Sequence, residues 1–69
     1  MALSARNQLE GTVRSVKLGD VVAEVIIELG NGQAVVSVIT RGSAEALGLK
    51  QGDRAKAVIK ATEVMVAKD

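Results

Sequence analysis

VVAEVIIELGNGQAVVSVIT, residues 21–40, is the stretch that most strongly determines the fold. In its first half apolar side chains recur at every second position, while Glu24 and Glu28 share the opposite face with Val22 and Ile26. The apolar face consists of Val21, Ala23, Val25, Ile27 and Leu29. A period of two is the period of a β-strand, so this half is predicted to form a strand with one wholly apolar face and one mixed face.

The middle of the stretch predicts a hairpin, because both residues of the Asn31-Gly32 pair tolerate a positive φ. The β-branched residues of 33–40 then form the returning strand. Upstream, 8–19 is predicted to form a first strand, with Gly11 as a bulge or bend, and 18–20 forms the turn into the second strand.

The pattern changes after residue 40. In TRGSAEALGLKQGD, residues 40–53, Ser43 is suited to the N-cap of a short helix, Glu45 to its first turn and Gly48 to its C-terminal end. One or two helical turns are therefore predicted here.

Alternation resumes over 54–61, where Ala55, Ala57 and Ile59 are predicted to point inward, and 63–67 is predicted to form a short fifth strand. The whole chain, residues 1–69, is then one all-β domain. Its order of elements matches the OB-fold, a small five-stranded Greek-key barrel, with one short helix between strands 3 and 4. An SH3-like barrel and an open meander remain alternatives.

Composition limits the size of the core. The chain has 69 residues, 48% of them hydrophobic, and it contains neither cysteine nor histidine. A single core of this size is marginal, and small domains gain stability from disulfides, a structural metal or self-association. Without cysteine and histidine a disulfide and an ordinary zinc site are excluded, so we expect an obligate homo-oligomer.

The same composition limits function. Thiol and imidazole chemistry is unavailable and the acidic residues form no concentrated cluster, so we expect no enzymatic activity, no cofactor and no direct metal ligands. Nucleic-acid binding is disfavoured by a net charge of +1 and by the absence of aromatic residues. No apolar run is long enough to span a membrane, and the N-terminus lacks the pattern of a signal peptide, which predicts a cytoplasmic protein.

Three segments carry a resemblance to a known family. SARNQLEG (4–11), TRGSAEALGL (40–49) and VIKATEVM (58–65) together resemble the molbindins, the small Mop-type proteins built from a single molybdate-binding TOBE domain. Each segment is a weak signal alone. In this order, and over essentially the whole chain, the combination is specific.

The resemblance implies a cytoplasmic protein that binds molybdate, and also tungstate, without transforming it. It implies OB-type barrels that pair by exchanging strands, a hexamer built as a trimer of dimers, and oxyanions at the subunit interfaces. A second class of anion site near the threefold axis is also implied, and Ser37 or loop backbone could form it. Because the sequence has neither a helix-turn-helix segment nor a P-loop motif, storage or buffering fits better than regulation or transport.

Two cations lie in the matching segments, Arg6 and Lys60. Molybdate is a tetrahedral dianion whose oxygens only accept hydrogen bonds, so its site needs positive charge and donors on several sides; molybdenum is bound as the oxyanion. Arg6 offers a guanidinium fork, Lys60 an ammonium group and Ser4 a hydroxyl. Backbone N–H groups near Ala5 and Ala61 add donors that small side chains leave accessible.

The resemblance extends the candidate site to Thr40 and Ser43, whose counterparts in related regulators lie near the bound anion. Several relatives carry serine where this chain has Ala61, which leaves only the backbone N–H there. Each residue also has a structural alternative: Arg6 as a solvated cation, Lys60 as an exposed strand end, Ser43 as a helix cap and Thr40 as an ordinary strand residue.

Asn7 and Gln8 are expected to hydrogen-bond backbone groups around the first strand rather than the anion. Two competing functions remain open. One is a structural or partner-binding oligomer without an anion, and the other is an OB-type nucleic-acid binder.

Overall fold

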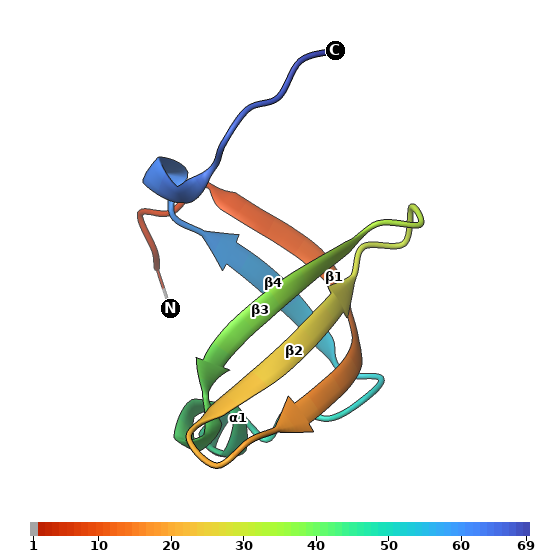
Figure 1. Ribbon diagram of the computed structural model, residues 1–69, viewed down its shortest axis with the longest axis vertical. Helices are drawn as coiled ribbons and strands as arrows, with labels where there is room; N and C mark the ends of the chain where they lie inside the picture. The colour runs from red at the N-terminus through yellow and green to blue at the C-terminus, as the bar shows by residue number, and fades with distance from the viewer. Residues whose placement is uncertain (1) are drawn as a thin grey trace.

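The computed structural model describes residues 2–69, and its strands form one antiparallel sheet (Figure 1). The strands are β1 (Asn7–Leu18), β2 (Val22–Glu28), β3 (Ala34–Thr40) and β4 (Arg54–Ile59). Helix α1 (Arg41–Leu47) joins β3 to β4, and one 3₁₀ turn, η1 (Ala61–Glu63), follows β4. These four strands lie where the sequence pattern predicts them, to within two residues, and the helix lies in its predicted place between the third and fourth strands.

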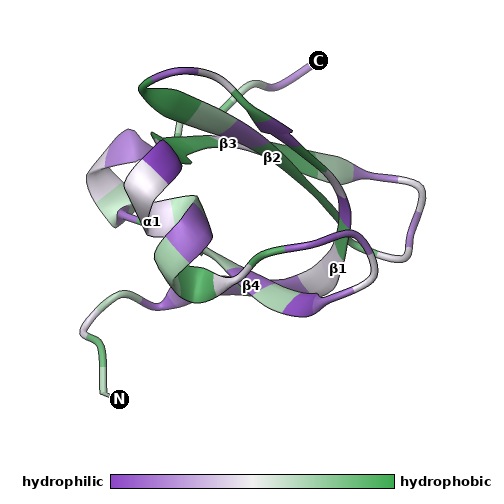
Figure 2. Cartoon of the chain, turned by 90° about the horizontal axis from the view of Figure 1, so that it is seen from below, coloured by the Kyte–Doolittle hydropathy of each residue, from purple (hydrophilic) through white to green (hydrophobic). Residues whose placement is uncertain are grey.

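The order of strands across the sheet is β3-β2-β1-β4. Placing the fourth strand beside the first is the Greek-key arrangement, and it excludes the open meander, in which β4 would neighbour β3. The sheet curls until β4 faces β2 and β3 (Figures 1 and 2). Within residues 2–69 the two edge strands, β3 and β4, do not pair with each other, so the barrel stays open along that seam.

The core lies inside the curl. Its buried residues are Val13, Ala23, Val25, Ile27, Ala44 and Ala57. The apolar face predicted for β2 is thus confirmed for its three central residues, whereas Val21 precedes the strand and is 74% exposed. Figure 2 shows hydrophobic and polar residues following one another along the strands, as expected for strands with one face toward the core. The core contains no aromatic residue and is small even for this chain length.

Gly11 is buried in β1, beside the end of β2, and its regular pairing with Ala55 of β4 shows that it is not a bulge. The irregularity in β1 lies between Val13 and Ser15 instead. A Cβ at Gly11 would lie 2.7 Å from Cγ2 of Ile27 and would overlap the carbonyl oxygen of Glu28. Glycine is therefore required here by the close approach of β2.

The Gly11→Ala variant is expected to lower the free energy of unfolding by about 2–3 kcal/mol, because backbone must move to admit the methyl group. In a domain of this size that is a fall in Tm of roughly 10–20 °C, measurable by circular dichroism. Gly42→Ala is the matched control, since Gly42 lies in α1 with no atom within 4 Å of the added carbon. It should be neutral or stabilising, through helix propensity. Equal melting of both variants would contradict the packing argument.

The β2–β3 hairpin forms as predicted, by a different mechanism. Gly30 and Gly32 adopt positive φ of 85° and 84°, whereas Asn31 does not. Its side chain shapes the turn instead: Asn31 Oδ1 accepts from the backbone N–H of Gln33 at 3.0 Å, and Asn31 Nδ2 donates to Gln33 Oε1 at 2.9 Å. Asparagine thus acts as an Asx turn former.

Helix α1 begins three positions earlier than the predicted cap requires. Thr40 is the N-cap, and its Oγ1 accepts from the N–H of Ser43 at 3.0 Å, so the assignment of Ser43 as cap is wrong. Glu45 lies beyond the first turn and pairs with Arg41. Gly48 ends the helix in the left-handed conformation, as predicted. Residues 2–69 contain no helix long and apolar enough to cross a membrane.

The predicted fifth strand, 63–67, is not formed within the chain. After η1 the C-terminal segment leaves the body of the molecule (Figure 1), and Val64, Met65 and Val66 are 50%, 93% and 92% exposed. A strand needs a neighbour for its backbone hydrogen bonds, and this segment has none in its own chain.

Candidate oxyanion site

Five of the predicted site residues line one hollow of ≈ 710 Å³ at the end of the barrel where η1 lies. These five are Ser4, Ala5, Arg6, Lys60 and Ala61. They come from the two ends of the sequence, and the sheet brings them together because Asn7 at the start of β1 pairs with Ile59 at the end of β4. The segment before β1 and the segment after β4 therefore leave the sheet side by side.

Three further residues line this hollow: Asn7, Val58 and Thr62. Thr62 lies in η1, directly after Ala61, and adds a hydroxyl that the sequence analysis missed. Val58 is the last residue but one of β4 and contributes an apolar side chain to the lining.

The hollow is electropositive. Its lining includes Arg6 and Lys60 and no carboxylate. The ion pairs found within residues 2–69 are Arg14–Glu28, Arg41–Glu45 and Lys50–Asp53, so neither cation of the hollow is neutralised by a carboxylate of the described chain. Ser4, Arg6, Lys60 and Ala61 are exposed and Ala5 is half-buried, which leaves the donors accessible from solvent.

Asn7 and Gln8 bond to main-chain carbonyls, as predicted. Asn7 Nδ2 donates to the carbonyl of Ile59 at 3.3 Å, and Gln8 Nε2 donates to the carbonyl of Ala5 at 2.7 Å.

Thr40 and Ser43 lie elsewhere, at the junction of β3 and α1. Their hydroxyl oxygens are hydrogen-bonded to each other at 2.7 Å. In Figure 1, α1 and η1 lie at opposite ends of the molecule, separated by the length of the sheet. One chain therefore does not bring Thr40 and Ser43 to the hollow that contains Arg6 and Lys60.

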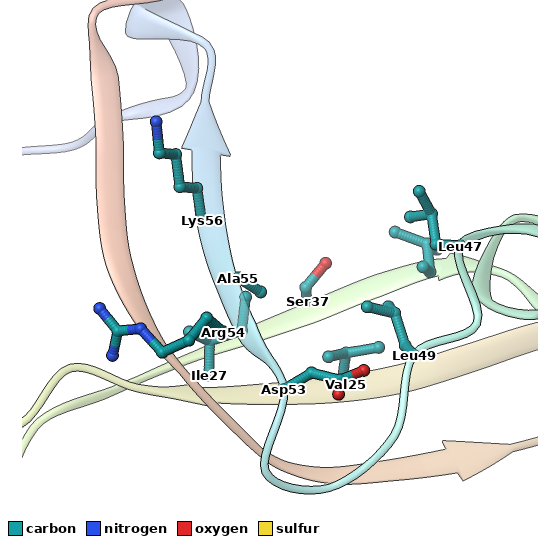
Figure 3. Close-up of a pocket in the computed structure, with 10 residues that line it drawn as sticks. Val25, Ile27, Ser37, Leu47, Leu49, Asp53, Arg54, Ala55 and Lys56 are labelled. Carbon is teal, nitrogen blue, oxygen red and sulfur yellow. The ribbon is translucent and has the colours of Figure 1, made fainter.

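A second hollow, of ≈ 510 Å³, opens along the seam between β3 and β4 and differs in chemistry. Val25, Leu47 and Leu49 converge on it, while the charged ends of Arg54 and Lys56 point away from these apolar side chains (Figure 3). Ser37, for which a role in a second anion site was considered, lies in this mostly apolar lining. The seam suits contact with another apolar surface better than it suits an anion.

Among residues 2–69 there is no cluster of three or more potential metal-ligating side chains. The polar side chains of the Arg6–Lys60 hollow are a guanidinium, an ammonium, two hydroxyls and an amide, without a carboxylate. Such a set offers positive charge and hydrogen bonds to an anion rather than lone pairs to a cation.

Comparison with known proteins identifies the family. The TOBE domain model matches residues 3–66. Molybdenum-pterin-binding protein 3 of Clostridium pasteurianum is 52% identical over 66 residues, which covers 96% of this chain and 97% of that protein. The probable molybdenum-pterin-binding protein of Haemophilus influenzae is 46% identical over 96% of each chain.

Solved structures agree on the fold. A molybdate-binding protein from Sporomusa ovata superposes with a TM-score of 0.92 at 40% identity, covering 99% of this chain and all of that one. MopII from Clostridium pasteurianum gives 0.90 at 45% identity, covering 97% and 100%. The cytoplasmic molybdate-binding protein ModG, solved with molybdate bound, gives 0.82 at 48% identity, covering 88% of this chain and 43% of that one. The resemblance read from the three segments is thus confirmed: the chain belongs to the TOBE-domain family and, within it, to the Mop-type molybdate-binding proteins, the molbindins.

Proposed function

We propose that this protein binds molybdate, as the intact oxyanion, in the hollow that contains Arg6 and Lys60. One observation carries the proposal: two cations from opposite ends of the sequence line a single hollow without a carboxylate beside them. The two positive charges of these side chains balance the two negative charges of the anion. The molybdate-binding relatives named above support the choice of this anion.

The oxyanion is favoured over a molybdenum-pterin, although the curated relatives carry the pterin in their names. Flat heterocycles are commonly held by stacking on aromatic side chains, and this chain has no Phe, Tyr or Trp. The hollow instead offers donors for a guest that only accepts hydrogen bonds.

The complete site is proposed to include two chains. In one chain the hollow is open, and the hydroxyls of Thr40 and Ser43 lie at the far end of the molecule. The two cations and these two hydroxyls can face the same anion only if Thr40 and Ser43 come from a second copy. A site at a subunit interface would also exclude water, which strengthens the attraction between the cations and the dianion.

Self-association is proposed to proceed through the C-terminal segment. Residues 64–67 are apolar and follow η1 along an extended path (Figure 1), with no partner strand among residues 2–69, while the seam between β3 and β4 lacks a strand to close it. If two copies exchanged these segments, each segment would gain a partner strand and each seam would gain the strand that it lacks. The product would be a closed, two-fold symmetric dimer. Three such pairs would form the hexamer implied by the resemblance.

The biological role is proposed to be storage or buffering of molybdate, and of the similar tungstate, in the cytoplasm. The anion is bound and released without chemical change, since the lining contains no carboxylate, imidazole or thiol that could activate a nucleophile. The relative ModG is a cytoplasmic molybdate-binding protein, which supports the compartment.

Equilibrium dialysis against labelled molybdate tests the function. We expect saturable binding that tungstate competes for and that an equal concentration of sulfate does not abolish. Native mass spectrometry of the same samples should show oligomers carrying molybdate in multiples set by their symmetry. Oligomers without any molybdate adduct, together with no saturable binding, would instead support a purely structural or partner-binding module.

A further inference from the structure

Two adjacent amide side chains hold the walls of the Arg6–Lys60 hollow. Gln8 Nε2 donates to the carbonyl of Ala5 within the N-terminal segment, and Asn7 Nδ2 donates to the carbonyl of Ile59 across β1 and β4. The second bond is partly buried and joins residues 52 positions apart. Both bonds are side-chain bonds. Gln8 holds a carbonyl that lies outside the sheet, whereas Asn7 adds a side-chain donor to the carbonyl of Ile59, the last residue of β4 and its own partner in the register.

Each accepting carbonyl belongs to the peptide unit that leads into one of the two cations. The carbonyl of Ala5 shares its peptide unit with the N–H of Arg6, and the carbonyl of Ile59 shares its unit with the N–H of Lys60. A trans peptide unit is planar, with its C=O and N–H pointing in opposite directions, and no cis bond occurs in the described chain. Fixing the carbonyl therefore fixes the direction of the following N–H and the point from which the cationic side chain departs.

This matters for a guest that only accepts hydrogen bonds. A carbonyl oxygen turned into the hollow would repel an oxyanion, whereas an N–H turned into it would attract one. The peptide unit before Arg6 lies outside β1 and can rotate between these two orientations at small cost, while the unit before Lys60 is held by the end of the sheet and by the amide of Asn7. An amide donor that occupies the carbonyl removes the repulsive orientation before the anion arrives.

We propose that Gln8 and Asn7 are positioning residues of the anion site, with Gln8 setting the peptide unit before Arg6 and Asn7 setting the unit before Lys60. The proposal rests on the proposed function, because the anion is the group that the two units are set to receive. Neither side chain has to touch the anion. The claim is specific because Gln8 acts on the segment before β1 and Asn7 acts on the segment after β4.

The test uses near-isosteric variants that lack the donor, Gln8→Met and Asn7→Leu. Each is expected to weaken molybdate binding by about five- to tenfold, the usual effect of losing one neutral hydrogen bond. Gln51→Met is the matched control: Gln51 is exposed, lies in the turn before β4 and does not line the hollow. Its affinity should equal that of the unmodified protein.

A second measurement separates positioning from general loosening and needs no ligand. Backbone N–H residual dipolar couplings should change for Arg6 in Gln8→Met and for Lys60 in Asn7→Leu, with the other wall unchanged in each case. Equal changes on both walls, or none on either, would overturn the positioning claim, as would unchanged affinity in both variants. If the unmodified protein binds no molybdate, the proposed function fails, while the dipolar couplings still decide whether each amide sets its own peptide unit.

Discussion

Replacing Lys60 by alanine is expected to weaken molybdate binding by about one to two orders of magnitude, and Arg6→Ala by a similar factor. Each substitution removes a charge-assisted hydrogen bond, worth about 1.5–3 kcal/mol, and leaves a dianion facing one positive charge. Every 1.4 kcal/mol is a tenfold change in affinity. Because both side chains are exposed and without an ion-pair partner among residues 2–69, their loss should leave the melting temperature without ligand nearly unchanged.

Isothermal titration calorimetry measures the effect, and two variants serve as controls. Lys17→Ala removes an equally exposed lysine of β1 that does not line the hollow, so it should bind normally. Arg6→Lys keeps the charge but loses the planar fork, and it should bind with intermediate affinity. Normal affinity in both alanine variants would exclude this hollow as the site, whatever else the protein binds.

The sequence predicts the four strands and the hairpin well because their signals are local. In β2 the period of two coincides with burial, so Ala23, Val25 and Ile27 lie in the core as expected. Gly48 ends the helix because only its own φ matters there. The start of the helix is less certain from the sequence. Thr40 and Ser43 are both residue types that favour the N-cap, and in the structure the N-cap is Thr40, at the end of β3.

The role of Gly11 could not be predicted from the sequence, because it depends on residues of another strand. Glycine in a strand is consistent with a bulge, a bend or a close approach, and these differ only in what lies opposite. The carbonyl of Glu28 and the side chain of Ile27, from β2, make it a close approach. Long-range contacts of this kind leave no trace in local spacing.

The candidate site shows the same difference between what local sequence signals predict and what long-range contacts decide. Arg6 and Lys60 meet because the register of β1 with β4 pairs Asn7 with Ile59, and the matching segments anticipated that meeting. Thr62 was missed because a 3₁₀ turn of three residues has no sequence pattern of its own. Thr40 and Ser43 remain predictions for the anion site. They lie at the opposite end of the molecule from the hollow, so a second copy of the chain would have to contribute them.

The fifth strand was predicted over 63–67, which was wrong for the single chain, and its absence there points to assembly. Residues 64–67 are consecutively apolar, yet a strand exists only where another strand pairs with it. The seam between β3 and β4 offers such a place, with an apolar hollow along it. A segment that is apolar, extended and unpaired is an unfavourable feature for a monomer, because it exposes hydrophobic surface and an unpaired backbone edge.

Deletion of residues 63–69 is therefore expected to convert the oligomer into monomer and to lower its Tm steeply. Burying Val64, Met65 and Val66 would contribute roughly 1.5–3 kcal/mol per side chain, so about 5 kcal/mol or more per chain. That is comparable to the whole stability of a domain of this size, roughly 3–10 kcal/mol at the usual value per residue. The unmodified protein should melt at a temperature that rises with protein concentration, whereas the truncated one should not.

Sedimentation velocity distinguishes the species, and deletion of residues 68–69 alone is the matched control, because it removes charged residues and keeps the apolar segment. A double variant, Val64→Asp with Val66→Asp, should reproduce the effect of the longer deletion in a chain of full length. Both valines lie on one side of the extended segment, so two carboxylates would have to enter the apolar seam, which costs several kcal/mol per charge. If the truncated chain and the double variant both sediment as the unmodified oligomer does, the C-terminal segment is not the element that joins the chains. The surface would then have to be sought among the exposed apolar residues of the sheet, such as Val36 and Val38 on β3.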